Sequence, residues 1–244
     1  MLRRRVWFDT LVDKPGMWKR SPDLPRVPRA FVNSSQWGDQ LYTLKQDYKR
    51  MPQMGNLDVV SINARYASNM HALGYTQGYL YLLRSLYLVF GNDEPIVYWS
   101  FVALIDIVRP YGPVGKSMGG PRGIRRVIEY ADPAFDVDLM IDLVTVRWGF
   151  IIFSQTFVDD ACLLCVWDAV VRDKRYIQCI IASMLQCIRF DAIDDPMVRL
   201  QMTCDQRIDC VNMTSHILSV ATQVHQRWYG EATQKRFRAG RSAR

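Results

Sequence analysis

Histidine is scarce in this chain, and several patterns of catalytic residues are missing altogether. Only three histidines occur in 244 residues, at positions 71, 216 and 225, and none lies in a nucleophile-like context. The sequence also has no Gly-x-Ser-x-Gly turn and no paired carboxylates in an obvious cleft segment. These absences argue against a hydrolase built on a serine triad or on two carboxylates.

Long apolar runs and a secretion signal are also missing. The longest apolar stretches lie near residues 79–90 and 149–157, and both are interrupted and shorter than the roughly 20 residues that span a bilayer. The apolar run that follows the first basic residues is too short for a signal peptide. Six cysteines occur between positions 162 and 210, in segments that read as helical. We therefore expect a soluble, cytoplasmic protein with reduced thiols.

The positive charge of the chain lies mainly at its two ends. Residues 1–30 carry eight basic and three acidic side chains, residues 227–244 carry six and one, and the net charge of the whole chain is +7. We interpret residues 1–226 as one folded domain and residues 227–244 as a basic C-terminal tail. The tail suggests peripheral contact with anionic endomembranes. A nucleic-acid partner is not expected, because no helix is crowded with Arg, Lys and Asn.

Large apolar side chains recur at helical spacing almost everywhere, and no segment alternates as a strand does. The clearest buried stripes fall in three segments, 57–68, 76–90 and 159–171. Turn and cap residues such as Gly91-Asn92-Asp93 separate one helical pattern from the next. With apolar residues at 49%, the pattern predicts an all-α fold, a single irregular multi-helix domain of roughly nine or more helices.

Some stretches predict irregular structure instead. They are rich in Pro, Gly and Ser or lie in the basic end of the chain, and they cover residues 13–38, 110–123 and 230–244. A last long helix is expected to open at Asp194-Asp195-Pro196 and to run through Ile208 toward Val224.

Two patterns that suggest ligand binding have simpler explanations. Gly115-Lys116-Ser117 looks like part of a phosphate-binding loop, but Pro110 stands where that motif needs Gly, and the preceding segment reads as helix. Cys162 and Cys165 have the spacing of metal ligands, but no second pair completes a structural zinc site. We interpret these two cysteines as small buried apolar groups and expect no metal or cofactor of the protein's own.

Two short motifs carry a more specific signal. Leu44, Asp47 and Arg50 form a Leu-x-x-Asp-x-x-Arg pattern, and Gly74-Tyr75-Thr76-Gln77-Gly78 follows it. In this order they resemble the Ile-x-x-Asp-x-x-Arg and Tyr-x-Gln-Gly motifs of the TBC domain, the family of Rab GTPase-activating proteins. The opening Leu2-Arg3-Arg4-Arg5-Val6-Trp7 and the later Trp167-Asp168 also look like that family. The resemblance covers roughly residues 1 to 220.

The chemistry of GTP hydrolysis explains why these residue types suit the task. Negative charge spreads over the γ-phosphoryl oxygens in the transition state, and the attacking water must be held in line. A guanidinium stays charged and offers several donors in a fixed fork, whereas a carboxamide accepts from water and donates to phosphate. A cation and an amide inserted together would therefore accelerate hydrolysis.

The resemblance implies a role for each motif residue. Arg50 would be an arginine finger and Gln77 a glutamine finger, both supplied in trans to a Rab-family small GTPase. Asp47 and Tyr75 would support them, and Gly74 and Gly78 would let the backbone approach the nucleotide closely. GTP and Mg would be bound by the partner, so the protein would complete the partner's active site without bond chemistry of its own.

The same residues are also compatible with other functions. Met51, Thr76, Tyr79 and Leu80 replace residues that are usual beside the two motifs, so a TBC-like protein that binds a small GTPase without stimulating it is the alternative. Arg65 is a competing cation, although it lacks the preceding Asp and its segment predicts an exposed position in the middle of a helix.

Overall fold

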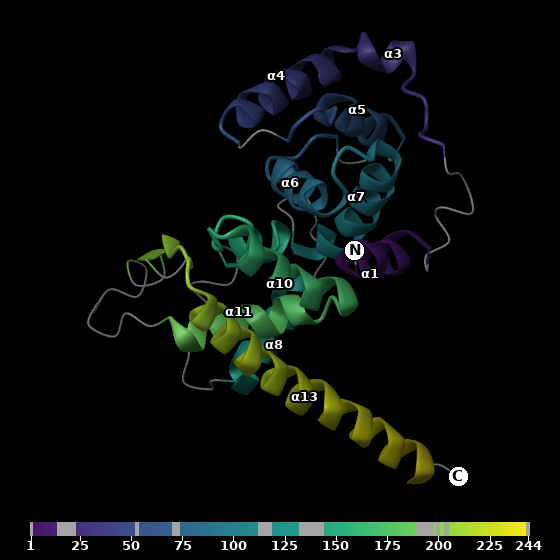
Figure 1. Cartoon of the computed structure of the whole chain (residues 1–244). Helices are drawn as coiled ribbons and strands as arrows, with labels where there is room; N and C mark the ends of the chain where they lie inside the picture. The colour runs from purple at the N-terminus through teal and green to yellow at the C-terminus, as the bar shows by residue number, and fades with distance from the viewer. Residues whose placement is uncertain are drawn as a thin grey trace. The chain divides into compact units, whose positions relative to one another are not determined.

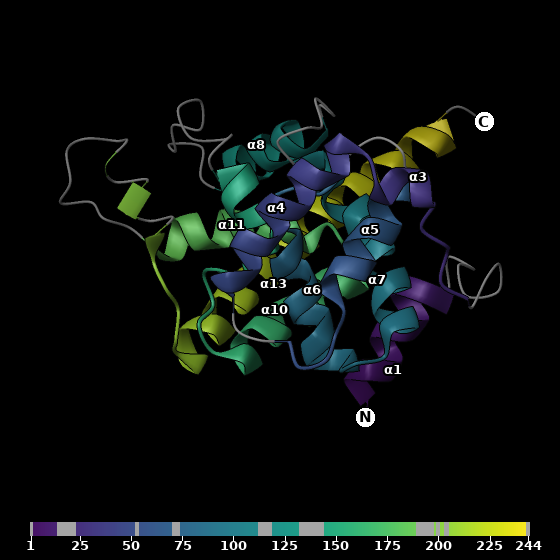
Figure 2. The ribbon, with the colours of Figure 1, turned by 90° about the horizontal axis from the view of Figure 1, so that it is seen from above.

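The computed structural model of the chain is mainly helical in the parts that it describes (Figures 1 and 2). These parts are residues 2–13, 23–51, 54–69, 74–111, 119–131, 144–188, 198, 201–202 and 205–242. Within them every named element is helical, and the only strand-like feature is an isolated bridge between Phe157 and Ile208. The predicted all-α fold with nine or more helices is confirmed.

The chain divides into two compact units, Met1–Val108 and Arg109–Arg244. The second unit ends in one long helix, α13 (Val211–Ser242), which continues without a break past residue 226. The boundary expected between residues 1–226 and the basic tail therefore coincides neither with the division between the units nor with the end of a helix.

The described residues of the first unit form six α-helices and one short π-helix. They are α1 (Leu2–Phe8), η1 (Asp9–Asp13), α3 (Arg29–Val32), α4 (Ser35–Lys49), α5 (Val59–Asn69), α6 (Tyr79–Phe90) and α7 (Glu94–Val108). Helices α6 and α7 pack side by side, α5 packs on α7, and α4 packs on α5 (Figures 1 and 2). This arrangement brings α4 and the start of α6 into the same unit.

Buried aromatic side chains form the centre of this first unit. The ring of Tyr79 at the start of α6 contacts Tyr66 of α5 and Phe101 of α7 edge to face, with centroid distances of 5.7 and 5.4 Å. Such contacts add to the free energy gained by burying the rings themselves. The predicted stripe of 76–90 is buried as expected, at Tyr79, Leu82, Leu83, Leu86 and Phe90.

The second unit has a hydrophobic core of its own. It contains η2 (Arg109–Tyr111), α8 (Gly119–Ala131), η3 (Thr145–Phe150), α10 (Asp160–Arg172), α11 (Tyr176–Cys187) and α13. Helix α11 packs against both α8 and α13. Trp167 of α10 is fully buried, and its indole N–H donates to the carbonyl of Ile152 at 2.9 Å.

Parts of all three stretches expected to be irregular are helical. Helices α3 and the first turn of α4 lie within 13–38, α8 begins at Gly119, and α13 includes residues 230–242. In the first stretch Ser34 caps α4 by accepting a hydrogen bond from the backbone N–H of Trp37 at 3.2 Å, which gives this Ser-rich segment a helix start. Gly115-Lys116-Ser117 lies outside the described residues.

The prediction of a long helix through Ile208 is also wrong. Residues 206–210 are not helical, and α13 begins only at Val211. The backbone of Ile208 instead pairs with the segment before α10: its N–H donates to Thr156 at 2.7 Å, and its carbonyl accepts from Val158 at 3.0 Å. These contacts compete with helical hydrogen bonding at Ile208. Asp194-Asp195-Pro196 lies outside the described residues.

The structure revises one prediction about the cysteines. Cys162 is buried as expected, but Cys165 is exposed, because α10 turns it away from the buried face that carries Leu164 and Trp167. Among the described residues, no group of His, Cys, Asp or Glu is arranged to hold a metal ion. None of the described helices combines the length and apolar character of a membrane span.

Asp173 links α13 to the turn between α10 and α11 through hydrogen bonds. Its carboxylate accepts hydrogen bonds from Arg175 Nε at 2.8 Å and from His225 Nε2 at 2.9 Å. Burial would raise the pKa of Asp173, but the hydrogen bonds from Arg175 and His225 outweigh it and leave the pKa below its ordinary value. The ionised form is therefore the one that the fold stabilises.

We expect Asp173→Asn to lower the free energy of unfolding at pH 7 by about 1 to 3 kcal/mol, because charge-assisted hydrogen bonds are lost. Since folding lowers the pKa, this contribution is present above the unfolded Asp pKa of about 3.9 and is lost as the pH falls through the folded value. Urea unfolding at pH 7 measures the effect, with exposed Asp209→Asn as control. Equal midpoints for the two variants would contradict this role of Asp173.

Candidate functional site

The first motif ends at the C-terminus of α4. Arg50 is the C-cap residue of this helix, and its backbone N–H donates to the carbonyl of Asp47 at 3.1 Å. Leu44 is fully buried and anchors this end of the helix. The Arg50 side chain is 75% exposed, whereas that of Asp47 is 16% exposed. The helix end therefore presents a guanidinium to solvent and turns the carboxylate inward.

The second motif forms the turn that leads into α6. Gly74 has φ +56° and Gly78 has φ +107°, both in the region that glycine alone adopts readily. Gly78 is the N-cap residue of α6, and its carbonyl accepts from the N–H of Tyr81 at 3.0 Å. Gln77 is exposed between these two glycines, whereas Tyr75 is buried. The turn thus buries the Tyr75 side chain and leaves the Gln77 carboxamide at the surface.

A hydrogen bond between side chains joins the two motifs. The Tyr75 hydroxyl donates to Asp47 Oδ2 at 2.7 Å, and the other carboxylate oxygen, Oδ1, lies 3.9 Å from Arg50 Nη1. One carboxylate therefore contacts both the tyrosine of the second motif and the arginine of the first. Residues separated by 28 positions in the sequence are linked within the first unit in this way.

Electrostatics keeps the phenol in its donating form. Burial, and then the hydrogen bond to Asp47, raise the pKa of Tyr75 far above its ordinary value. Removing the phenolic proton would place a second negative charge beside a carboxylate in a partly buried position. The raised pKa therefore keeps the Tyr75 hydroxyl protonated, as a donor to Asp47, at neutral pH.

Gln40 is a second contact between α4 and this turn, and sequence reasoning missed it. Its Oε1 accepts the backbone N–H of Tyr75 at 2.9 Å. Gln40 lies seven residues before Asp47, so the two side chains occupy the same face of α4. That spacing, continued through the buried Leu44, is the sequence signal that could have identified Gln40.

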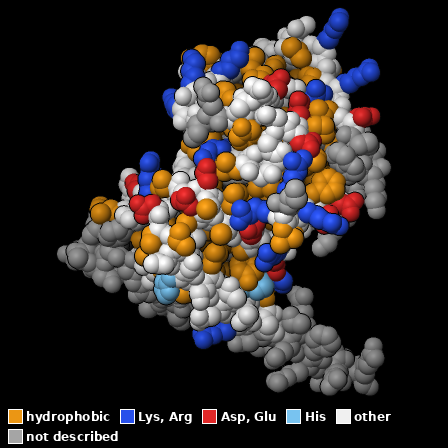
Figure 3. All heavy atoms as spheres, in the orientation of Figure 1, with side chains coloured by type: hydrophobic (Ala, Val, Ile, Leu, Met, Phe, Trp, Pro, Cys, Tyr) orange, Lys and Arg blue, Asp and Glu red, His pale blue; other side chains and the backbone are white. Residues whose placement is uncertain are grey.

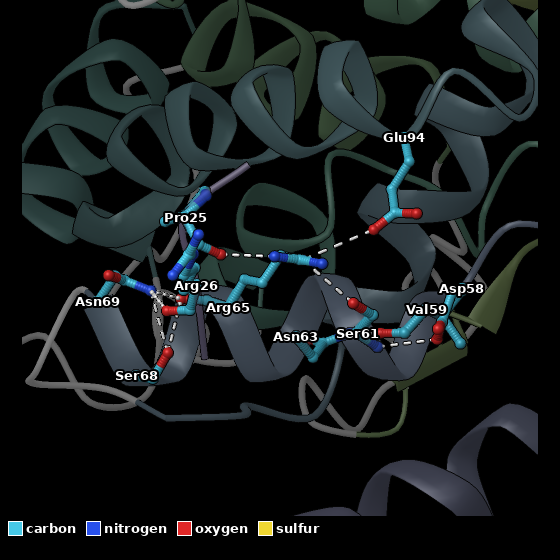
Figure 4. A network of polar contacts seen from close by, with 10 residues as sticks. All are labelled: Pro25, Arg26, Asp58, Val59, Ser61, Asn63, Arg65, Ser68, Asn69 and Glu94. Atoms are coloured by element: carbon cyan, nitrogen blue, oxygen red, sulfur yellow. Dashed lines mark hydrogen bonds and ion pairs between the residues drawn. The ribbon is translucent and has the colours of Figure 1, made fainter. Parts of the chain in front are cut away.

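Arg65, the competing cation, is part of a structural network (Figure 4). Its guanidinium donates from Nη1 to the Pro25 carbonyl at 2.6 Å and from Nε to Ser61 at 3.1 Å, and its Nε lies 3.7 Å from a Glu94 oxygen. The side chain is 23% exposed. The expectation of an exposed position in the middle of the helix is wrong, because the segment around Pro25 covers this face of α5.

The four residues that depart from the family motifs occupy two kinds of position. Tyr79 and Leu80 are each 1% exposed and belong to the core at the start of α6. Met51 and Thr76 are partly exposed, beside Arg50 and Gln77 respectively. The first pair thus contributes to packing, and the second pair lies at the surface next to the two candidate side chains.

We expect Tyr75→Phe to lower the free energy of unfolding by about 1 to 3 kcal/mol, because the mostly buried Asp47 carboxylate loses its hydroxyl donor. The same change at Tyr42, which is 67% exposed on α4, is the matched control and should have little effect. Urea midpoints of both variants measure the difference. If the two phenylalanine variants unfold at the same midpoint, the link between the motifs contributes no stability.

Charged side chains of both signs are interspersed on the face drawn in Figure 3. Basic side chains of the described residues lie there among acidic, hydrophobic and other side chains. The side chains of residues 231–242 are not described, so membrane contact through the basic tail stays a prediction.

Comparison with known proteins assigns no function to this site. No protein-family model matches the chain, and no curated protein does so either. The observations that bear on function are therefore the paired motifs, the carboxylate that connects them, and the exposure of one guanidinium and one carboxamide.

Proposed function

We propose that this chain is a GTPase-activating protein of the TBC type, which stimulates GTP hydrolysis by a Rab-family small GTPase. Arg50 would neutralise charge that develops on the γ-phosphoryl group, and Gln77 would orient the attacking water. GTP and Mg belong to the partner in this proposal, and the protein completes the partner's active site. Cytoplasmic action near endomembranes is part of the same proposal.

The hydrogen bond from Tyr75 to Asp47 is the observation that carries the proposal. Catalysis by two inserted side chains requires that both be held by one rigid body, because small errors of position cost large factors in rate. The bond supplies such a connection between the segments that bear Arg50 and Gln77. Both side chains are exposed, as groups that enter a partner's site must be.

Single-turnover GTP hydrolysis by a panel of purified Rab GTPases tests the function. We expect the full chain to accelerate hydrolysis by at least one of them in proportion to its concentration. Binding to a GTP-loaded GTPase without any acceleration across the panel would support the alternative, a TBC-like scaffold or effector. That alternative is favoured by Met51 and Thr76, which are partly exposed beside the two fingers.

A further inference from the structure

One face of α4 holds the turn of the second motif at two points. Gln40 accepts from the backbone N–H of Tyr75, and Asp47 accepts from the hydroxyl of the same residue, at 2.9 and 2.7 Å. Seven residues of helix rise about 10 Å, and the side chains of Gln40 and Asp47 both reach from α4 to the two ends of one tyrosine. Tyr75 therefore lies along α4 with a hydrogen bond at each end.

Gly74 allows the contact between Gln40 and the backbone of the turn. A Cβ atom at this position would overlap Gln40 Nε2 and lie 2.7 Å from its carboxamide carbon, and φ is +56°. Any other residue would therefore displace the Gln40 amide and strain the backbone as well. The turn and the amide fit directly against each other, two and three residues before Gln77.

We propose that Gln40 is a positioning residue for Gln77, an inference that rests on the proposed function. Gln40 lies outside both motifs. It acts through the backbone of Tyr75, whose N–H it fixes, and thereby sets where the turn delivers the Gln77 carboxamide. Asp47 holds the Tyr75 side chain, whereas Gln40 binds the backbone N–H of the chain that leads on to Gln77.

Two substitutions separate the hydrogen bond from the volume of the side chain. Gln40→Met keeps the length of the chain but removes the acceptor, whereas Gln40→Glu keeps an acceptor oxygen in the same place. With a stimulated GTPase as substrate, we expect Gln40→Met to lower kcat about tenfold to a hundredfold and to leave KM within about twofold. Gln40→Glu should stay near the wild type. Gln36→Met, at an exposed position of the same helix, is the matched control.

Amide exchange reports the same contact without a GTPase. We expect the Tyr75 amide to be protected in the wild type and in Gln40→Glu, and to exchange at least tenfold faster in Gln40→Met. If Gln40→Met does not fold, protection of this amide in the wild type together with an active Gln40→Glu supports the inference. An unprotected amide in the wild type overturns it.

The kinetic outcomes distinguish this inference from the proposed function. A wild type that accelerates no GTPase overturns both. A wild type that is active, with a Gln40→Met variant of equal kcat, overturns the role of Gln40 alone. A loss confined to KM also overturns that role, because it would mean that Gln40 contributes to docking instead of to the position of Gln77.

Discussion

Replacing Arg50 by alanine should reduce the stimulated rate of GTP hydrolysis by about 10³- to 10⁵-fold, the range measured for arginine fingers in other GTPases. The rate should fall because the γ-phosphoryl oxygens lose the cation that neutralises them in the transition state. Stability should change little, because the side chain is 75% exposed and its ion pair with Asp47 is long, at 3.9 Å. Single-turnover hydrolysis and circular dichroism measure the two properties separately.

Lys49→Ala is the matched control for this prediction. Lys49 precedes Arg50, is also exposed, and also carries a positive charge near the end of α4. Its loss should change the rate only modestly, through the general attraction between the two proteins. Equal losses from Lys49→Ala and Arg50→Ala would mean that positive charge in this region matters and that a specific finger does not.

Trp167→Ala should lower the free energy of unfolding by about 3 to 5 kcal/mol, the largest effect on stability that we expect from one substitution. Trp167 is fully buried in the second unit, so alanine leaves a cavity where a large ring was packed. The substitution also removes the donor to the Ile152 carbonyl. Urea unfolding followed by circular dichroism measures the loss.

The backbone beside Trp167 makes that hydrogen bond important. Ile152 and Phe153 have φ of +48° and +60°, which costs free energy for a β-branched or aromatic residue. Trp167→Phe, which keeps an aromatic ring but no N–H, should lose only about 1 to 3 kcal/mol. Val158→Ala, at a position 53% exposed, should be nearly neutral. A loss below about 1 kcal/mol in Trp167→Ala would contradict the packing described here.

Hydrophobic spacing was sufficient to predict the best-packed helices. The stripe of 159–171 corresponds to α10, and its large side chains Leu163, Leu164, Trp167, Val170 and Val171 are all buried. Such a stripe is a local property, since residues three and four apart share one face of a helix. The position of α10 could therefore be read without knowing what it packs against.

Contacts between distant segments could not be predicted in this way. The helix expected through Ile208 is interrupted because its backbone pairs with Thr156 and Val158, about 50 residues earlier. Arg65 is covered by the segment around Pro25, 40 residues earlier. Neither contact can be recognised from the hydrophobic spacing of the sequence near Ile208 or Arg65.

In the candidate site, too, the sequence predicts local features but not contacts between distant segments. The motifs name Arg50 and Gln77, and both are exposed, but the motifs alone do not say that Asp47 accepts from Tyr75 or that Gln40 holds the backbone of the turn. Those contacts depend on the packing of α4 within the first unit. The sequence thus predicted the two candidate catalytic side chains, and the structure identified the residues that hold their segments.

The joint action of Arg50 and Gln77 is tested most directly with a stimulated GTPase whose own water-positioning glutamine is replaced by leucine. We predict that the wild-type chain still accelerates GTP hydrolysis by this partner, because Gln77 supplies the missing carboxamide. Gln77→Ala and Arg50→Ala should each abolish that acceleration while remaining folded. If Gln77→Ala instead accelerates hydrolysis by this partner as well as the wild type does, the two side chains do not act together in the way proposed.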